Sequence, residues 1–142
     1  SNCALNIAKG KWITYFDDDD IMAPHFLESL LTFAVEGNHE FVAGLYEEER
    51  DGVRSVRGQQ DDKQPEFGGH STWLYRSYLK YFKYNINSWR KSYNCPQDID
   101  MQLRMKKAGV RMKSLNEVVS YIRPRPGLNT IGLAARLVSE EK

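Results

Sequence analysis

Four consecutive aspartates, Asp17 to Asp20, are the residues of this chain whose type and spacing most directly indicate chemistry. They follow a short apolar run, WITYF, at residues 12–16, which predicts a buried strand. Carboxylates about 5 Å apart repel one another by roughly 3 kcal/mol at an effective dielectric constant near 20, so their convergence requires a cation or abundant water. The aspartates therefore predict either a metal site or a solvated turn at the end of a strand.

Other interpretations of the aspartates stay open at this point. One of them would serve to cap the helix that Ala23-Pro24 begins. An aspartate-nucleophile phosphohydrolase also places Asp-x-Asp after a buried strand, although it needs Thr or Ser where this chain has Ile21. An EF-hand is disfavoured, because the sixth position counted from Asp17 is Met22, where that loop needs Gly.

A second segment with chemical potential is CPQDIDMQLRMKKAG at residues 95–109. Pro96 and Gly109 are expected to bound a helix, and Asp98 lies at its start. Considered alone, an aspartate at this place is most simply a helix N-cap.

Isolated residues elsewhere are weaker candidates for ligand contacts. His70 follows two glycines and is most simply a structural histidine; Trp73 has a flat face that suits a sugar ring but is more simply a core residue. Arg123 and Arg125 follow a predicted strand and would suit a diphosphate, although the prolines beside them also fit a stiff loop with solvated charges. The tyrosines of the middle region are expected only to pack: Tyr75, Tyr78, Tyr81 and Tyr84.

The elements that must position these residues alternate between helix and strand, which is typical of an α/β domain. The sequence predicts helices ending at Gly10, over 24–36, over 77–84, within 95–109 and over 130–141. It predicts strands over 12–16, 40–47 and 70–76, with a hairpin turn at Asp51-Gly52. A further strand or pair of strands is expected within 110–122, where Val118, Val119, Tyr121 and Ile122 are the most strand-like residues.

Composition narrows the class of protein. With 142 residues and 41% hydrophobic residues, the chain suits a single domain, 1–142, with one core. A net charge of +1 gives no general attraction to nucleic acid. We find no apolar run of about 18 residues that would predict a transmembrane helix. Cys3 and Cys95 lack metal-ligand spacing, which favours free thiols and a cytoplasmic location.

Three segments, in this order, resemble the family 2 glycosyltransferases, which are inverting nucleotide-sugar enzymes with the GT-A fold. The first reads N-x-A-L-x-x-A-x-G-x-W-I-x-x-x-D-D-D-D-x-x-x-P from Asn2 to Pro24; the others are PQDIDMQLR at 96–104 with KAG at 107–109, and YIRPR at 121–125. The resemblance implies a mixed, mostly parallel sheet flanked by helices. It also implies an N-terminally truncated domain, because the family's opening nucleotide-binding strands would precede this sequence.

Residue by residue, the resemblance implies a donor site and a base. Asp17 and Asp19 fall on the family's Asp-x-Asp motif, in which Asp19 would bind Mn²⁺ or Mg²⁺ and Asp17 would lie toward the metal and the ribose, with Asp20 as a supporting carboxylate. Asp98 falls on the aspartate that acts as general base toward the acceptor hydroxyl. Gln97 stands where the family usually has Glu.

The resemblance also implies partners and a location. The donor would be a UDP-linked nucleotide sugar and the acceptor a glycan or a lipid-linked glycan, as in bacterial polysaccharide biosynthesis. His70, Trp73 and Gln97 would lie toward the substrate; since no histidine follows His70, Arg123 and Arg125 would make the phosphate contacts. The full-length parent would be cytoplasmic or at the cytoplasmic membrane face, and an exposed sheet edge would allow pairing with a second copy. A sugar-binding or interaction domain without chemistry is the alternative.

Overall fold

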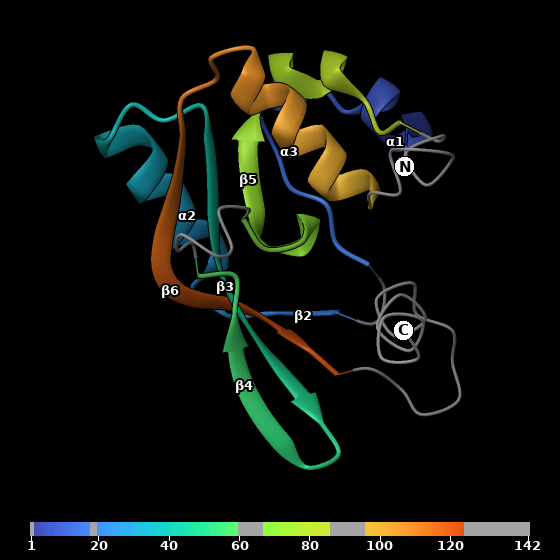
Figure 1. Ribbon diagram of the computed structural model, residues 1–142. Helices are drawn as coiled ribbons and strands as arrows, with labels where there is room; N and C mark the ends of the chain where they lie inside the picture. Colours follow the sequence, from blue (N-terminus) through green and yellow to red (C-terminus); the bar gives the residue numbers. More distant parts are fainter. Residues whose placement is uncertain (1, 18–19, 60–66, 86–95, 124–142) are drawn as a thin grey trace.

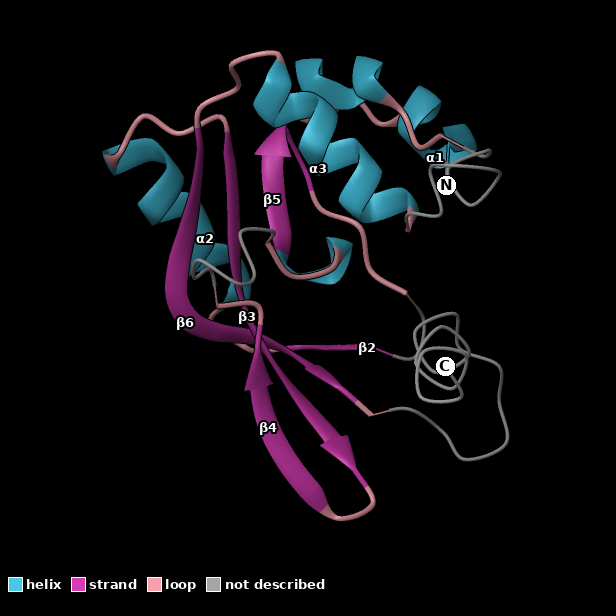
Figure 2. Ribbon diagram, viewed as in Figure 1, coloured by secondary structure: helices cyan, strands magenta, loops and turns pink. Residues whose placement is uncertain are grey.

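A computed structural model describes residues 2–17, 20–59, 67–85 and 96–123. In this part of the chain, one six-stranded sheet carries helices on both faces (Figures 1 and 2). The helices are α1 (Asn2–Ile7), α2 (Phe26–Glu36) and α3 (Gln97–Lys107), with the 3₁₀ helices η1 (His70–Thr72) and η2 (Ser77–Phe82). The strands are β1 (Trp12–Ile13), β2 (Asp20–Met22), β3 (Phe41–Arg50), β4 (Val53–Arg57), β5 (Trp73–Arg76) and β6 (Met112–Ile122).

The sheet is mixed, as predicted, but it is not mostly parallel. Its order is β1-β5-β3-β6-β2, and β4 pairs with β3 beside this path. Among the described strands only β3 and β6 run parallel, while the other pairs are antiparallel. The physical reason is the length of the connections: β3 and β4 are joined by the predicted tight turn, whereas the long passage through α3 allows β6 to return parallel to β3.

Alternation along the central strands builds a core on each face of the sheet. Phe41 and Ala43 of β3 point to the face covered by α1, η2 and α3, where they join Trp73 and Met101. Val42 points to the opposite face, with the α2 side chains. Because successive strand side chains alternate, a central strand such as β3 contributes to both cores.

Several elements differ from the sequence prediction in extent. The apolar run over 12–16 keeps only two residues in β1, which is an edge strand, and the chain then leaves the sheet toward Asp17. The segment 70–76 begins as the 3₁₀ turn η1, and the predicted helix over 77–84 is the 3₁₀ helix η2, which ends at Phe82. The predicted helix over 130–141 lies outside the described residues.

Helix ends also differ slightly from the prediction. α1 ends at Ile7, so Gly10 is not its cap. α2 begins at Phe26 after a turn through Pro24, and it buries Phe26, Leu30 and Ala34, while Leu27 is exposed. Gly109, with φ +84°, ends α3 as predicted.

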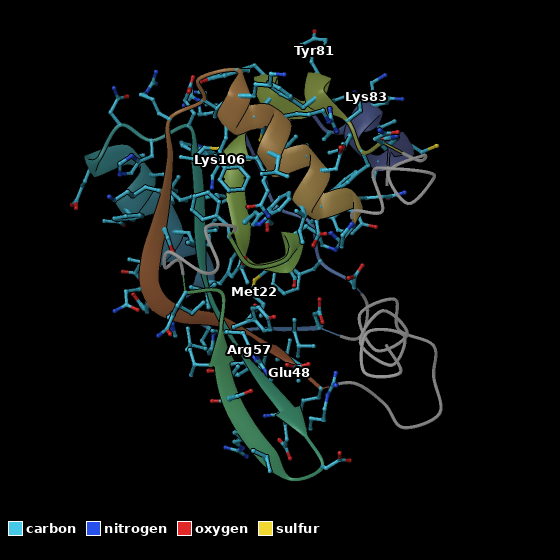
Figure 3. All side chains as sticks on the ribbon, viewed as in Figure 1. Met22, Glu48, Arg57, Tyr81, Lys83 and Lys106 are labelled. Carbon is cyan, nitrogen blue, oxygen red and sulfur yellow. The ribbon has the colours of Figure 1, made fainter. Side chains whose placement is uncertain are left out.

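The β3–β4 hairpin extends away from the helices (Figure 1). Glu48 is buried on it and forms ion pairs with Arg50 at 3.2 Å and Arg57 at 3.6 Å. Figure 3 shows Glu48 and Arg57 on the hairpin, far from Tyr81 and Lys83 at the other end of the molecule. Tyr81 is 80% exposed and does not pack in the core. No helix among the described residues is long and apolar enough to cross a membrane.

Candidate active site

His70 and Asp17 form the first contact of the candidate site. The His70 Nε2 atom lies 3.0 Å from Asp17 Oδ2, and the two side chains are 23% and 47% exposed. Asp17 follows β1, and His70 begins η1 directly before β5, the neighbour of β1 in the sheet. Strand pairing therefore brings together two candidates that lie 53 positions apart in the sequence.

Asp98 approaches the same place from α3. It lies in the first turn of this helix, whose N-cap is Pro96, so the prediction that Asp98 caps the helix is wrong. Its Oδ1 atom accepts a hydrogen bond of 2.9 Å from the Ile99 N–H. A Cβ atom added to Gly69 would lie only 3.2 Å from Asp98 Oδ2, which places this oxygen against the backbone beside His70.

The segment that carries His70 is fixed by buried hydrogen bonds. The fully buried Gln102 side chain of α3 accepts from the Phe67 N–H at 2.7 Å and donates to the Phe67 carbonyl at 3.3 Å. Trp73 Nε1 donates to the Gly68 carbonyl at 2.7 Å. Gln102 is not among the residues that the sequence indicates as functional; its signal is a polar residue at a buried position of the predicted helix. These bonds fix the distance between α3 and η1, and thus between Asp98 and His70.

Negative charge surrounds the His70 ring. Burial by itself would lower the pKa of His70, but the hydrogen bond and charge of Asp17, together with the charges of Asp98 and Asp20, raise it above its ordinary value. The hydrogen bond from His70 lowers the pKa of Asp17, against the opposing effect of its own burial. Three carboxylates from two segments of the chain, the aspartate run and the start of α3, thus act on one imidazole.

The aspartate run itself is only partly described. Asp20 begins β2, pairs with Ile122 of β6, and donates its N–H to the Asp17 carbonyl at 3.2 Å. Asp19, the predicted main metal ligand, lies outside the described residues. Among the residues that are described, no three His, Cys, Asp or Glu side chains are grouped to hold a metal ion. Asp17 and Asp20 carry carboxylate oxygens, the kind of ligand that Mg²⁺ and Mn²⁺ prefer.

Arg123 lies close to the aspartate segment in the backbone, but its side chain is engaged elsewhere. It follows Ile122, the partner of Asp20, and its Nε atom lies 3.4 Å from Glu49 Oε2 of β3. Arg125 and Cys95 lie outside the described residues, and Cys3 is a free, exposed thiol. Gln97 is the first residue of α3, directly before Asp98.

Trp73 is not placed to bind a sugar. The side chain is 0% exposed and packs with its ring centroid 5.0 Å from that of Phe41. The suggestion that Trp73 presents a flat face to a sugar ring is therefore wrong for this structure. The physical reason is its position in β5, a strand with a neighbour on each side and α3 packed across its face.

Tyr15 and Tyr84 border the site, although the sequence did not assign them to it. The Tyr15 ring centroid lies 4.6 Å from that of His70, in an edge-to-face arrangement. The Tyr84 ring centroid lies 6.0 Å from His70 and 6.1 Å from Tyr15. No spacing in the sequence separates these residues from the other tyrosines, because only the fold brings residues 15, 70 and 84 together.

Comparison with solved structures supports the architecture. The crystal structure of S. aureus TarS 1–349 in complex with UDP-GlcNAc matches with a TM-score of 0.63 and 19% identity, over 89% of this chain and 38% of that one. The crystal structure of S. aureus TarS 1–349 matches with a TM-score of 0.57 and 17% identity, over 86% of this chain and 38% of that one. At these identities the likeness concerns the fold, and this chain spans 38% of either structure.

Comparison with protein families is more specific. A search of curated proteins gave no match. The sequence model of the family described as glycosyl transferase family 2, in contrast, matches residues 1–107, which include the aspartate run, His70 and Asp98. This match spans most of the chain and agrees with both the sequence motifs and the GT-A-like fold. The chain therefore belongs to glycosyl transferase family 2.

Proposed function

We propose that this chain carries the metal-binding and acceptor-activating residues of an inverting glycosyltransferase. The enzyme would move a sugar from a nucleotide-diphosphate donor to a hydroxyl group of a glycan or lipid-linked acceptor. The observation that supports this proposal is that His70 contacts Asp17 at 3.0 Å and directly follows Gly69, against which the Asp98 carboxylate lies. Clustered, charge-perturbed groups of this kind are typical of functional sites.

Asp98 is the general base of the proposed reaction. It takes the proton of the acceptor hydroxyl, whose oxygen attacks the anomeric carbon on the side opposite the diphosphate. The new C–O bond forms as the bond to the diphosphate breaks, and the electron pair leaves with the nucleoside diphosphate, so the configuration inverts. The hydrogen bond from Ile99 to Oδ1 orients this carboxylate. Gln97 is neutral and adds no second negative charge beside Asp98.

The aspartate run would hold the donor through a divalent cation. Asp17, Asp19 and Asp20 are oxygen ligands of the kind that suit Mn²⁺ or Mg²⁺. When bound, the cation would stabilise the negative charge of the leaving diphosphate. Arg123 would exchange Glu49 for a phosphate oxygen, and Arg125 would add a second contact.

We propose a UDP-linked donor, because the TarS structure with the higher TM-score holds UDP-GlcNAc. His70 and Gln97 would line the substrate side of the site, next to Asp17 and Asp98 respectively. We further propose a cytoplasmic enzyme, at the cytoplasmic membrane face if its acceptor is lipid-linked, with a role in bacterial polysaccharide biosynthesis.

Calorimetric titration with UDP, with and without Mn²⁺, tests the donor site. Wild-type chain is expected to bind UDP only when Mn²⁺ is present, and Asp17→Asn and Asp19→Ala are expected to abolish this binding. Asp51→Asn is the matched control, since Asp51 is an exposed aspartate in the β3–β4 turn. Binding that needs no metal, or that survives in both site variants, would contradict the proposal.

Asp98→Asn separates transfer from donor binding. In a protein that contains this chain and transfers sugar, the variant is expected to lose transfer by about 10²- to 10⁴-fold, the usual contribution of general-base catalysis. Its UDP affinity with Mn²⁺ should stay that of the wild type. Glycan binding that is indifferent to metal, to nucleotide and to this substitution would instead favour the non-catalytic alternative.

A further inference from the structure

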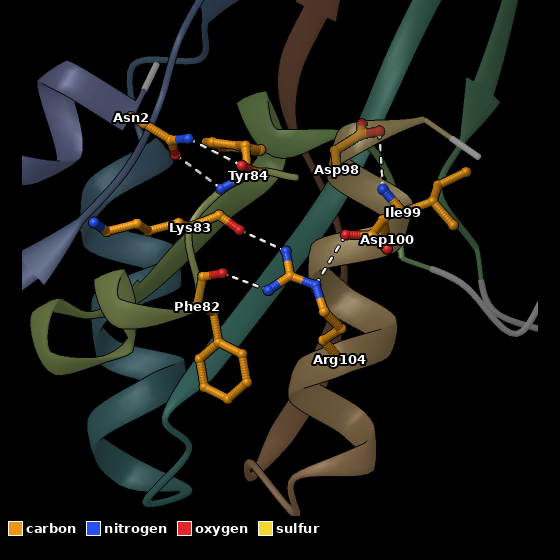
Figure 4. Close-up of polar contacts among 8 residues, drawn as sticks. All are labelled: Asn2, Phe82, Lys83, Tyr84, Asp98, Ile99, Asp100 and Arg104. Atoms are coloured by element: carbon orange, nitrogen blue, oxygen red, sulfur yellow. Dashed lines mark hydrogen bonds and ion pairs between the residues drawn. The ribbon is translucent and has the colours of Figure 1, made fainter. Parts of the chain in front are cut away.

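Residues 82–84, at the end of η2, are held by side chains from two of the family-like motifs. Asn2 of α1 donates its Nδ2–H to the Tyr84 carbonyl at 2.9 Å, and the Tyr84 N–H donates back to Asn2 Oδ1 at 2.9 Å (Figure 4). One side chain thereby satisfies both backbone groups of Tyr84. The asparagine that opens the first motif thus fixes the backbone position of a tyrosine 82 positions away.

Arg104 of α3 fixes the two preceding residues. Its guanidinium donates to the carbonyls of Phe82 and Lys83, and its Nε–H donates to Asp100 Oδ2 at 2.9 Å (Figure 4). Lys83 has a φ of +50°, a conformation that a residue with a side chain adopts only when its surroundings impose it. Arg104 belongs to the second motif. A polar side chain from each motif, Asn2 from the first and Arg104 from the second, therefore positions the backbone at Tyr84.

The Tyr84 hydroxyl is the polar group that these contacts leave unsatisfied. The residue is only 4% exposed, and its hydroxyl oxygen is buried without a hydrogen-bond partner among the described residues. An unmade hydrogen bond on a buried hydroxyl is costly, so such a group calls for an explanation. A backbone held on both sides to place an unsatisfied hydroxyl indicates that the hydroxyl meets a ligand.

The surroundings of the phenol specify the chemistry of that ligand. The Tyr84 ring centroid lies 6.0 Å from that of His70, and the Asp98 carboxylate lies against Gly69, the residue directly before His70. Burial, and then the charges of Tyr75, Asp98 and Asp17 among others, raise the pKa of Tyr84, so the phenol keeps its proton and donates. The Asp98 carboxylate, in contrast, only accepts. A group that accepts from Tyr84 and donates to Asp98 is a hydroxyl, whereas a phosphate oxygen has no proton to give.

We propose that Tyr84 contacts the acceptor hydroxyl: its phenol donates a hydrogen bond to the hydroxyl oxygen, while the proton of that hydroxyl is directed to Asp98. The inference rests on the proposed function and names the group that orients the nucleophile within it. Asn2 and Arg104 are positioning residues that act through Tyr84.

Tyr84→Phe tests this assignment, with Tyr75→Phe as the matched control. Tyr75 is also fully buried, its hydroxyl has no hydrogen-bond partner within the described part of the chain, and burial alone raises its pKa to about 12. Three quantities are measured for both variants: the melting temperature, the affinity for UDP with Mn²⁺, and UDP release from UDP-GlcNAc with Mn²⁺, in which water serves as the simplest hydroxyl acceptor.

Tyr84→Phe is expected to keep or raise the melting temperature, because it removes a buried unsatisfied group. It should leave UDP affinity unchanged and lower UDP release about tenfold, roughly the loss of one hydrogen bond to the nucleophile. Tyr75→Phe should leave UDP release unchanged.

Two results would overturn the inference while leaving the proposed function intact. One is wild-type UDP release by Tyr84→Phe. The other is a melting temperature that falls well below that of Tyr75→Phe, which would show that the hydroxyl holds a structural partner; this measurement does not depend on turnover. Failure of the wild-type chain to bind UDP with Mn²⁺ would instead overturn the proposed function itself.

Discussion

At the scale of single residues, the site depends on close approach rather than on unusual residue types. Gly69 is the clearest example, because its missing side chain is what lets the Asp98 carboxylate rest against the backbone next to His70. Its φ of −62° is one that any residue adopts, so a larger side chain at this position is opposed only by the space that Asp98 occupies.

Gly69→Ala is therefore expected to impair transfer without unfolding the protein. A Cβ atom 3.2 Å from Asp98 Oδ2 forces the carboxylate to shift by a few tenths of an ångström. Displacement of a catalytic group on this scale should lower the transfer rate by about tenfold, with a change in unfolding free energy within about 0.5 kcal/mol. Gly10→Ala is the control, since its Cβ atom would meet only the Trp12 carbonyl at 3.4 Å. Equal transfer rates in the two variants would show that Asp98 does not depend on this contact.

At the scale of elements, the parallel pair β3–β6 is the centre of the sheet. Between Ala43 and Leu45 its register shifts, and the residue at the shift is Gly44. A Cβ atom on Gly44 would lie 2.5 Å from Val119 Cγ2 and 3.1 Å from the Glu117 carbonyl. Glycine here allows β6 to pack closely against β3 where the ladder is irregular.

Gly44→Ala is expected to destabilise the fold by about 1–3 kcal/mol, as overpacking does in a tight core. Chemical denaturation measures the loss. Because the nearest atoms are the Val119 methyl groups, Val119→Ala should relieve part of the clash, so the double variant should be more stable than the sum of the two single changes predicts, by at least about 0.5 kcal/mol. Simple additivity would mean that the Glu117 carbonyl, not Val119, sets the limit.

The starts of β3 and β6 are joined by hydrogen bonds to the Glu40 carboxylate. Glu40 precedes β3 and accepts hydrogen bonds from the Arg111 N–H at 2.8 Å and from the Tyr78 hydroxyl at 2.7 Å. The backbone hydrogen bond from Arg111, followed by that from Tyr78, lowers the pKa of Glu40 below its ordinary value of 4.5. A lowered pKa means that the ionised glutamate stabilises the folded state above pH 4.5 and that this contribution is lost as the pH falls through the lowered value.

Glu40→Gln should therefore make stability less sensitive to acid. Denaturant titrations between about pH 3 and pH 7 are expected to show a smaller decline below pH 4.5 for the variant than for the wild type. At neutral pH the variant should already be less stable, since hydrogen bonds to a charged acceptor are worth roughly 1.5–3 kcal/mol. Glu36→Gln, at the exposed end of α2, is the control. Acid profiles that coincide for Glu40→Gln and wild type would refute the linkage.

At the scale of the whole molecule, the candidate site and the Glu40 hydrogen bonds lie at opposite ends of the strands. Asp17, His70 and the start of α3 lie where β1 ends and β5 begins. Glu40 and its partners lie at the opposite ends of the strands, where β3 and β6 begin, next to a surface cleft lined by Trp12 and Arg111. The end strands β1 and β2 are short, and β4 carries arginines paired with glutamates. Short and charged edges oppose pairing between copies, so association through a sheet edge stays a prediction.

Ligand binding should stabilise the whole chain if the donor site is formed in the folded state only. Mn²⁺ and UDP together, at about 100 times the dissociation constant, are expected to add roughly 2.7 kcal/mol. For a domain of this size, that corresponds to a rise in melting temperature of about 8 °C. Neither component alone should reach this value, and Asp17→Asn should remove the shift. A rise of the same size with UDP alone would argue against a metal-bridged donor.

The sequence by itself determined the features that depend on local order. The Asp51-Gly52 turn, the end of α3 at Gly109, the C-terminal part of β6 and the family-like motifs around Asp17 and Asp98 could all be recognised, because neighbouring residues carry the signal. Turn chemistry, helix termination and hydrophobic patterning act over a few residues and need no tertiary partner.

Only the tertiary structure decided which of the candidates meet. It placed His70 on Asp17, buried Trp73, turned Arg123 toward Glu49, and brought Tyr84 to the site. It also made most strand pairs antiparallel. These outcomes depend on strand order and on packing between residues far apart in the chain, and such long-range contacts leave no periodicity or spacing in a single sequence.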